Sequence, residues 1–441
     1  MAKRMKRVFA TLAGVALTGA AAFGIYAWHS ALPEVARPDP ASFAPALVQR
    51  GAVLAAAGYC GSCHTAKGGK PFAGGYAMAT PFGTIYSTNI TPDARTGIGT
   101  WSQAAFTRAM REGVARDGSH LFPVFPYDHF HKLTDEDISA LYAFLMVQPA
   151  VEAPEHKNSV PFPLNIRLLQ AGWKLLFFHP EPFRADPSRS VAWNRGAYLA
   201  QGLSHCGACH TPRNALGGEQ HGKAFAGAAI DGWIAPPLDA SNPAPVAWSK
   251  DELAAYLGTG VSRYHGTAAG PMAPVVHGLA QLPPADVEAL ATYFADVAGT
   301  AGKTVDPTPA LAKALAAGRT GTGLTYDRPA RLYAAACASC HYNGVDTKTG
   351  GAHPLRPELA LNNALNLDDP TNLIQVMVHG IDARDGAPGV VMPAFGHLRD
   401  ADLAAIAGYL RATRTNKAPW TDLDQKIAAV RAQAAAQAKG E

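Results

Sequence analysis

The segment CGSCH at residues 60–64 returns twice along the chain, as CGACH at 206–210 and CASCH at 337–341. These three segments contain all six cysteines of the sequence, so none remains for a disulfide or an iron–sulfur cluster. On a helical turn, residues i, i+3 and i+4 share one face. Each segment therefore predicts two thiols and one imidazole that point to the same side of a short helix.

This pattern indicates three covalently attached haem groups. A lone C-x-x-C pair is also found in zinc sites and in thiol–disulfide pairs, but three copies that each end in histidine favour c-type haem. The residues expected to bond the porphyrins are Cys60, Cys63, Cys206, Cys209, Cys337 and Cys340. The residues expected to ligate the irons on one side are His64, His210 and His341. The haems are numbered 1 to 3 in chain order.

The composition is that of a folded protein and gives no case for nucleic-acid binding. Of its 441 residues, 48% are hydrophobic and 16% are charged, which excludes a disordered chain. The net charge is +4, and no basic stripe stands out, so nothing favours nucleic-acid binding. At about 100–200 residues per domain, the length suits three small domains.

The N-terminal segment, residues 1–31, has the features of a membrane anchor or a secretion signal. Basic residues at positions 3–7 precede an uncharged apolar run from Val8 to Trp28. At 1.5 Å per residue this run would be about 31 Å long, enough to cross a membrane. A cleaved signal would use a shorter run and a small-residue site such as 20–22. We expect an anchor, with the basic flank in the cytoplasm and the rest of the chain on the far side.

Sequence repetition around the motifs predicts three similar domains. The segments before the motifs resemble one another, at 50–54, 195–199 and 330–333. Each repeat then closes with apolar residues at helical spacing, at 133–145, 282–295 and 398–410. We expect each domain to begin with a helix, attach a haem, loop around it and end with a helix, without a large sheet. The predicted domains are 45–148, 190–298 and 326–415.

Two segments lie outside these domains. The connection 149–189 is long enough to have structure of its own, and LNIRLLQAGWKLLFF at 164–178 predicts a helix with a large apolar face. We expect this helix to bridge domains 1 and 2; the alternative is a helix on the membrane surface. The C-terminal tail, 416–441, predicts an exposed, alanine-rich helix from Asp422 onward.

The second axial ligand of each iron sets the chemistry, because methionine raises the reduction potential and favours electron transfer. Met392, within VMPAF at 391–395, is the candidate for haem 3, and Met377 is expected to be a core residue. Met272, within GPMAP at 270–274, is the candidate for haem 2. His265 and His277 are the alternatives for haem 2, and for them surface or loop positions are expected.

Haem 1 departs from this pattern. The corresponding segment, 121–131, has no methionine, and Met110 and Met146 are expected to be packing residues. The first candidate ligand is His129 and the second is His131; alternatively, haem 1 has no sixth ligand from the protein. A second histidine gives a lower potential than methionine, so we expect haem 1 to have the lowest of the three.

These motifs resemble those of the tri-haem cytochrome c subunits of membrane-bound periplasmic dehydrogenases from proteobacteria. The resemblance covers most of 45–415, and its most specific segments are FAGGYAMATPFGTIYSTNITPDARTGIGTWS (72–102), REGVARDGSHLFPVFPYDHF (111–130), CGACHTPRN (206–214) and VMPAF (391–395). It implies an all-α chain of three tandem class I cytochrome c-like domains. It also implies a periplasmic location and electron transfer to ubiquinone or a terminal oxidase.

The resemblance implies a catalytic dehydrogenase as partner. Phe125 stands where the quinoprotein alcohol dehydrogenase branch has methionine, and FPYDHF looks more like the branch that accompanies molybdenum hydroxylases. Such partners contain molybdenum and iron–sulfur centres and oxidise aldehydes or N-heterocycles. Partners of the pyrroloquinoline quinone (PQQ) or flavin type remain alternatives.

We expect an electron-transfer subunit, because the sequence shows no substrate-oxidising site of its own. The partner would oxidise the substrate, and this chain would carry the electrons. Two other functions are considered: a haem peroxidase that uses an open haem 1, and a soluble shuttle without a fixed partner. Within the first function, residues 164–178 would be one place for ubiquinone to meet the protein at the cytoplasmic membrane.

Overall fold

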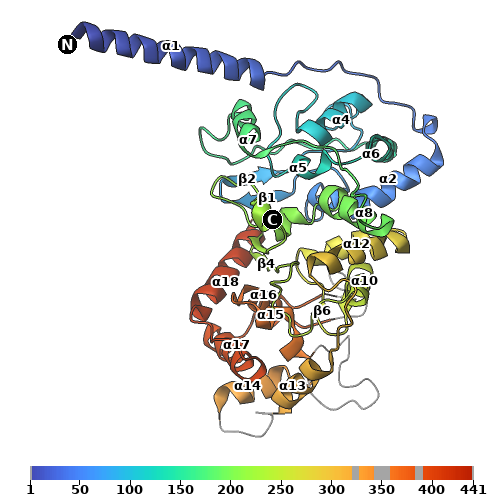
Figure 1. Ribbon diagram of the computed structural model, residues 1–441, viewed down its shortest axis with the longest axis vertical. Helices are drawn as coiled ribbons and strands as arrows, with labels where there is room; N and C mark the ends of the chain where they lie inside the picture. The colour runs from blue at the N-terminus through green and yellow to red at the C-terminus, as the bar shows by residue number, and fades with distance from the viewer. Residues whose placement is uncertain (1, 320–326, 342–357, 383–390, 440–441) are drawn as a thin grey trace. The chain divides into compact units, whose positions relative to one another are not determined.

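The computed structural model describes residues 2–319, 327–341, 358–382 and 391–439 (Figure 1). Residue 326, the first of the predicted third domain, and residues 440–441 of the predicted tail lie outside the described residues. The chain divides into two compact units. The first consists of Met1–Ala55 and Cys60–Phe183, and the second of Ala56–Tyr59 and Arg184–Glu441. The first motif lies in the first unit, and the other two motifs lie in the second.

Helices form most of the regular structure. From the N-terminus to residue 183 they are α1 (Ala2–Ala27), η1 (Pro40–Ser42), α2 (Pro45–Ala57), α3 (Cys60–Cys63), α4 (Gln103–Glu112), α5 (Tyr127–Phe130), α6 (Asp135–Val147), η2 (Arg167–Leu169) and α7 (Gln170–Phe177). Next come α8 (Val191–Tyr198), the π-helical turn η3 (Leu199–Leu203), α9 (Gly207–His210), η4 (His221–Lys223), α10 (Lys250–Thr259), α11 (Met272–Leu279) and α12 (Pro284–Val297). The remaining helices are α13 (Thr308–Arg319), α14 (Arg328–Ala336), η5 (Leu359–Leu361), α15 (Asn363–Asn366), α16 (Thr371–His379), α17 (Asp400–Arg414) and α18 (Leu423–Lys439).

The strands of the described residues pair only as short antiparallel hairpins. They are β1 (Ala77–Thr80) with β2 (Gly83–Tyr86), β3 (Ala228–Ile230) with β4 (Trp233–Ala235), and β5 (Val261–Ser262) with β6 (Gly266–Thr267). Their registers place Ala77 opposite Tyr86 and Ala228 opposite Ala235. The expectation of a helix-rich fold without a large sheet is therefore confirmed for the described part of the chain.

In the first two repeats, the first and last helices cross at a glycine. A Cβ atom built on Gly51 of α2 would lie 2.0 Å from the carbonyl oxygen of Ala140 in α6. A Cβ atom on Gly196 of α8 would lie equally close, at 2.0 Å, to the carbonyl oxygen of Ala289 in α12. Only glycine lets the two backbones approach this closely. The sequence pair RG at 50–51 and 195–196 thus marks one repeated helix crossing.

An arginine–aspartate ion pair accompanies each crossing. The pairs are Arg50–Asp137 at 2.6 Å, Arg195–Asp286 at 2.6 Å and Arg328–Asp402. Each of the three closing segments begins with leucine, and the aspartate lies four residues after it. All three aspartates are largely buried. The third repeat has Arg331 at the glycine position, and its α14 and α17 instead bring the rings of Tyr333 and Tyr409 to 5.6 Å.

The C-terminal helix α18 corrects the expectation of an exposed tail. It contacts α16 and α17 (Figure 1). Ile427 and Val430 are 0% and 3% exposed, and with Trp420 they belong to the same core cluster as Tyr333 and Leu403. The helix is therefore part of the core around α14 and α17.

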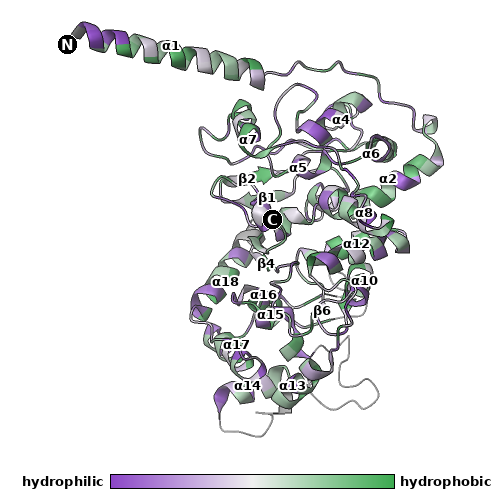
Figure 2. Cartoon of the chain, viewed as in Figure 1, coloured by the Kyte–Doolittle hydropathy of each residue, from purple (hydrophilic) through white to green (hydrophobic). Residues whose placement is uncertain are grey.

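Helix α1 is long and apolar enough to cross a membrane. The qualifying stretch, Lys3–Ala27, has 25 residues, none of its most apolar window is buried, and it lies near the N-terminus. Figure 2 shows the hydrophilic first turns followed by mostly hydrophobic ones. A retained anchor and a secretion signal both fit these properties.

Candidate haem-binding sites

All three motifs form a helical turn. The backbone N–H of the histidine donates to the carbonyl of the first cysteine, four residues earlier, in each motif. The N···O distances are 2.9 Å for His64, 3.0 Å for His210 and 2.9 Å for His341. The two thiols and the imidazole of each motif therefore lie on one side of the turn, as their spacing predicts.

The first two histidines are oriented by backbone carbonyls. His64 Nδ1 lies 2.7 Å from the carbonyl oxygen of Thr88, and His210 Nδ1 lies 2.7 Å from that of Pro236. Because a carbonyl only accepts, Nδ1 carries the proton and Nε2 keeps its lone pair. A metal-ligating histidine is held in this way, with the second nitrogen fixing the tautomer. Thr88 lies two residues after β2 and Pro236 directly follows β4, so the β1–β2 and β3–β4 hairpins position the ligands.

Burial disfavours the charged forms of the cysteine and histidine side chains in the motifs. Burial raises the pKa of the Cys60 and Cys206 thiols to about 12 and that of Cys337 to about 11. Burial also lowers the pKa of His64 and His210. The neutral imidazole is the form of histidine that ligates a metal. All six cysteines are described, and none forms a disulfide.

Met272 and Met392 lie on structured segments that follow the haem-side loops. Met272 is the half-buried first residue of α11. The loop before it is fixed by Gly270, where a Cβ atom would lie 2.4 Å from the Trp233 ring. Met392 is half-buried, and its backbone exchanges hydrogen bonds of 2.8 and 3.0 Å with Ile381. Each methionine therefore has a defined backbone position.

The other candidates for haem 2 and haem 3 have different surroundings. Met377 is 5% exposed within the core cluster of α16, α17 and α18, as expected. His277 is exposed. His265 lies in the turn between β5 and β6, which agrees with the expected loop position, but it is not at the surface. It is 5% exposed, its ring stacks on Trp248 at 3.7 Å, and burial lowers its pKa to about 3. Neither of its ring nitrogens has a hydrogen-bond partner among the described residues.

Around haem 1 the structure buries both candidate histidines in and after α5. His129 is 7% exposed and His131 is 8% exposed. The ring of His131 is engaged by the protein, with Nδ1 3.2 Å from the Tyr127 carbonyl oxygen and Nε2 3.4 Å from Lys132 Nζ. Met110 and Met146 are 5% and 0% exposed within α4 and α6, which agrees with packing roles.

Phe125 takes the position of the missing methionine. The left-handed C-caps Gly113 of α4 and Gly260 of α10 are equivalent. Phe125 lies twelve residues after Gly113, and Met272 lies twelve residues after Gly260. Phenylalanine has no atom that can ligate iron, so the first repeat differs from the second at the distal position.

His120 has a buried role that the sequence analysis did not assign. It is 3% exposed, its Nε2 lies 2.8 Å from the Ala27 carbonyl oxygen, and its Nδ1 lies 3.0 Å from Lys174 Nζ. His120 is equivalent to Thr267 of the second repeat, because Val114 pairs with His120 as Val261 pairs with Thr267. This difference between the repeats is the signal that could have drawn attention to His120.

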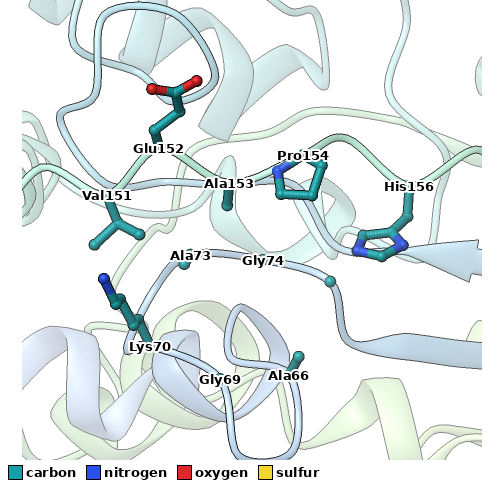
Figure 3. A pocket seen from close by; sticks show the side chains of 11 residues that line it. Ala66, Gly69, Lys70, Ala73, Gly74, Val151, Glu152, Ala153, Pro154 and His156 are labelled. Carbon is teal, nitrogen blue, oxygen red and sulfur yellow. The ribbon is translucent and has the colours of Figure 1, made fainter. Parts of the chain in front are cut away.

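A hollow of about 230 Å³ lies beside the first motif (Figure 3). Its walls are residues 66–75, just after the motif, and residues 151–156 of the connection. Two of the side chains at its edge are engaged elsewhere: Glu152 pairs with Arg95, and His156 stacks on Tyr86 at 5.3 Å. The beginning of the connection is therefore packed against the loop after motif 1.

A helical C-x-x-C-H turn with its histidine fixed through Nδ1 is the haem-attachment site of a c-type cytochrome, and this chain contains domains of that class. The family model for cytochrome c matches residues 48–148. The model for cytochrome C oxidase, cbb3-type, subunit III matches residues 325–410.

Relatives among known proteins are more specific. The fructose dehydrogenase cytochrome subunit of Gluconobacter japonicus is 38% identical over 85% of this chain and 80% of its own length. The gluconate 2-dehydrogenase cytochrome c subunit of Pantoea cypripedii is 40% identical over 88% of this chain and 90% of its own length. The chain belongs to the family of dehydrogenase cytochrome c subunits. It is also 45% identical, over 98% of its length, to a nicotinate dehydrogenase subunit of Pseudomonas putida, of which it spans 36%.

Proposed function

We propose that this chain is a tri-haem electron-transfer subunit, with one covalent haem c in each of three tandem cytochrome c-like domains. The observation that carries the proposal is the repetition of one cradle: a helical C-x-x-C-H turn between two crossing helices joined by an arginine–aspartate pair. A helical turn at the motif and an arginine–aspartate pair between the flanking helices occur at motifs 1, 2 and 3, which supports three haem sites. When bound, the haem irons supply one-electron transfer, and the protein holds and tunes them.

The chain's residues divide into attaching and ligating groups. The thioether residues are Cys60, Cys63, Cys206, Cys209, Cys337 and Cys340, and the proximal ligands are His64, His210 and His341. Met272 and Met392 serve as the sixth ligands of haems 2 and 3. The ordered backbone at both methionines supports this assignment, since a ligand must be held in one position.

For haem 1 we assign the sixth position to His129. His129 lies four residues after Phe125, and Phe125 is the residue at the position that Met272 occupies in the second repeat. The Nε2 of His131 lies 3.4 Å from Lys132 Nζ, so His131 is kept as the second candidate. Histidine ligation closes this iron to small ligands and gives haem 1 the lowest potential. A peroxidase would instead need a haem 1 without a sixth ligand from the protein.

The electron donor is a catalytic dehydrogenase subunit of the molybdenum hydroxylase type, acting on aldehydes or N-heterocycles. The similarity to the nicotinate dehydrogenase subunit over 98% of this chain and the motif FPYDHF support this choice. Partners of the flavin or PQQ type are the alternatives, given the fructose, gluconate and alcohol dehydrogenase relatives. The acceptor is ubiquinone or a terminal oxidase, and α1 anchors the chain on the periplasmic side of the cytoplasmic membrane.

The proposal is tested by purifying the tagged full chain from membranes of its own host. We expect molybdenum and iron–sulfur subunits to co-purify, and the haem absorption to change to the reduced form when the partner's substrate is added. The matched control is the Cys206→Ala/Cys209→Ala variant, which should keep the partner but lose one haem. Purification without any dehydrogenase subunit, or with haems that stay oxidised with every substrate that the subunit oxidises, would contradict the proposal.

A further inference from the structure

The segment 162–178 has its two basic side chains turned inward, whereas Asn165 is exposed. Arg167 is half-buried between the exposed Ile166 and Leu168. Its Nε donates to the His120 carbonyl oxygen at 2.6 Å, and its guanidinium lies over the Phe122 ring. The basic group that would normally face water thus faces the protein.

Lys174 shows the same inversion further along the segment. It is 5% exposed, and its Nζ donates to the carbonyl oxygens of Glu112 and Gly113 at the end of α4, at 2.5 and 2.9 Å. Carbonyls at a helix C-terminus are good acceptors for a cation. Gln170, also buried, lies between the two basic residues. Positions 167, 170 and 174 share one helical face, so this face is the inner one.

The outer face is apolar. Seven large hydrophobic side chains between 162 and 176 are exposed, with exposed fractions from 39% to 80%, and the polar Asn165 is exposed among them. They are Phe162, Leu164, Ile166, Leu168, Leu169, Leu175 and Leu176. We call these seven side chains the apolar ridge. Figure 2 shows α7 mostly in the hydrophobic colours. A contiguous exposed group of this kind marks a contact surface, because single exposed leucines are common but clusters are not.

The ridge is continuous with the end of α1. Helices α1 and α7 are in contact, and a Cβ atom on Gly172 would lie 3.8 Å from the Phe23 ring. The Ala27 carbonyl oxygen is held by His120, which also contacts Lys174. Ile25 and Trp28, at the same end of α1, are 79% and 70% exposed. The ridge therefore lies where a membrane-spanning α1 leaves the bilayer.

We propose that the apolar ridge of residues 162–176 inserts into the lipid bilayer beside α1, as a second and monotopic contact with the membrane. Lipid is the occupant because the ridge adjoins the one described helix able to span a membrane and presents no cation to the outside. The contact is then with acyl chains rather than through attraction to anionic headgroups. The inference rests on the proposal that α1 is retained as an anchor.

The test uses the full-length holoprotein in liposomes that contain a phospholipid with a photoreactive diazirine on its acyl chain. After illumination, labelled peptides are mapped by mass spectrometry. We expect label on peptides from α1 and from 162–178. Peptides with Val191 and Leu216, exposed at 88% and 56% outside the ridge, serve as controls and should remain unlabelled.

The matched variants separate this inference from the anchor proposal. Leu175→Asp/Leu176→Asp should lower label on 162–178 by about tenfold, because charge is costly in the hydrocarbon region, and should leave the label on α1 and the haem content unchanged. Val191→Asp should change nothing. Label on α1 with none on 162–178 would overturn the membrane contact and leave the anchor intact. Cross-linking of the ridge to another subunit or a second copy, without lipid label, would also overturn it.

Discussion

Gly196 offers a direct test of the repeated helix crossing. A Cβ atom there would lie 2.0 Å from the Ala289 carbonyl oxygen and 2.8 Å from Tyr293 Cβ. Ordinary van der Waals contact needs more than 3.4 Å, so Gly196→Ala must push α8 and α12 apart by more than 1 Å. Overpacking of this kind costs about 3 kcal/mol, while the better helix propensity of alanine offsets about 1 kcal/mol. We expect a net loss of about 2 kcal/mol.

The matched control is Gly258→Ala in α10. There a Cβ atom would meet Val287 Cγ1 at 3.5 Å, an ordinary contact. The helix propensity then acts alone, and the variant should gain about 0.5–1 kcal/mol.

Because the chain has several folding units, local stability is the better measure. Hydrogen–deuterium exchange of the holoprotein, followed by mass spectrometry of the α8 and α12 peptides, reports local opening. A loss of 2 kcal/mol corresponds to exchange about 30-fold faster in Gly196→Ala. Exchange in that variant as slow as in the wild type would refute the account of the crossing.

Three further perturbations have defined outcomes. Asp286→Asn should cost about 1–2 kcal/mol, because it breaks the bidentate pair with Arg195. The control Glu288→Gln breaks the exposed pair with Lys250 and should cost under about 0.5 kcal/mol. Equal shifts of the thermal midpoint in the two variants would argue against this difference. His265 has a folded pKa of about 3 against about 6.5 when unfolded, so the folded state binds fewer protons between these values and stability should fall as pH drops through this window. His265→Phe should flatten that pH dependence, and a melting curve that keeps the wild-type slope would exclude His265 as its source. Met272→His should lower the potential of haem 2, and His129→Met should raise that of haem 1, as measured by spectroelectrochemical titration; an unchanged potential in either variant would remove that residue from the ligand set.

The sequence predicted the attachment turns and the helices that frame them, because both follow from local spacing. The i, i+3, i+4 pattern of Cys60, Cys63 and His64 requires only one helical turn. The closing helices are visible through their apolar periodicity. The aspartates of the ion pairs were visible in the same segments, but their partners Arg50 and Arg195 are more than 85 residues away.

Other features could not be read from sequence, since they depend on tertiary contacts. The carbonyls of Thr88 and Pro236, which orient the ligands, are backbone groups without a residue signature. The burial of α18 depends on two apolar residues, Ile427 and Val430, in an alanine-rich helix with little periodicity. The apolar pattern of 164–178 fixes two faces but does not tell which one meets water, so the inward turn of Lys174 was visible only in the structure.

The claim at the centre of this account is that each of the three C-x-x-C-H turns carries a covalent haem. Intact mass spectrometry of the full chain, produced together with the cytochrome c maturation machinery, measures this directly. We predict three haem masses per polypeptide and two in each variant whose cysteine pair at one motif is replaced by alanine. A wild-type chain with fewer than three haems, or a motif variant that keeps all three, would contradict the account.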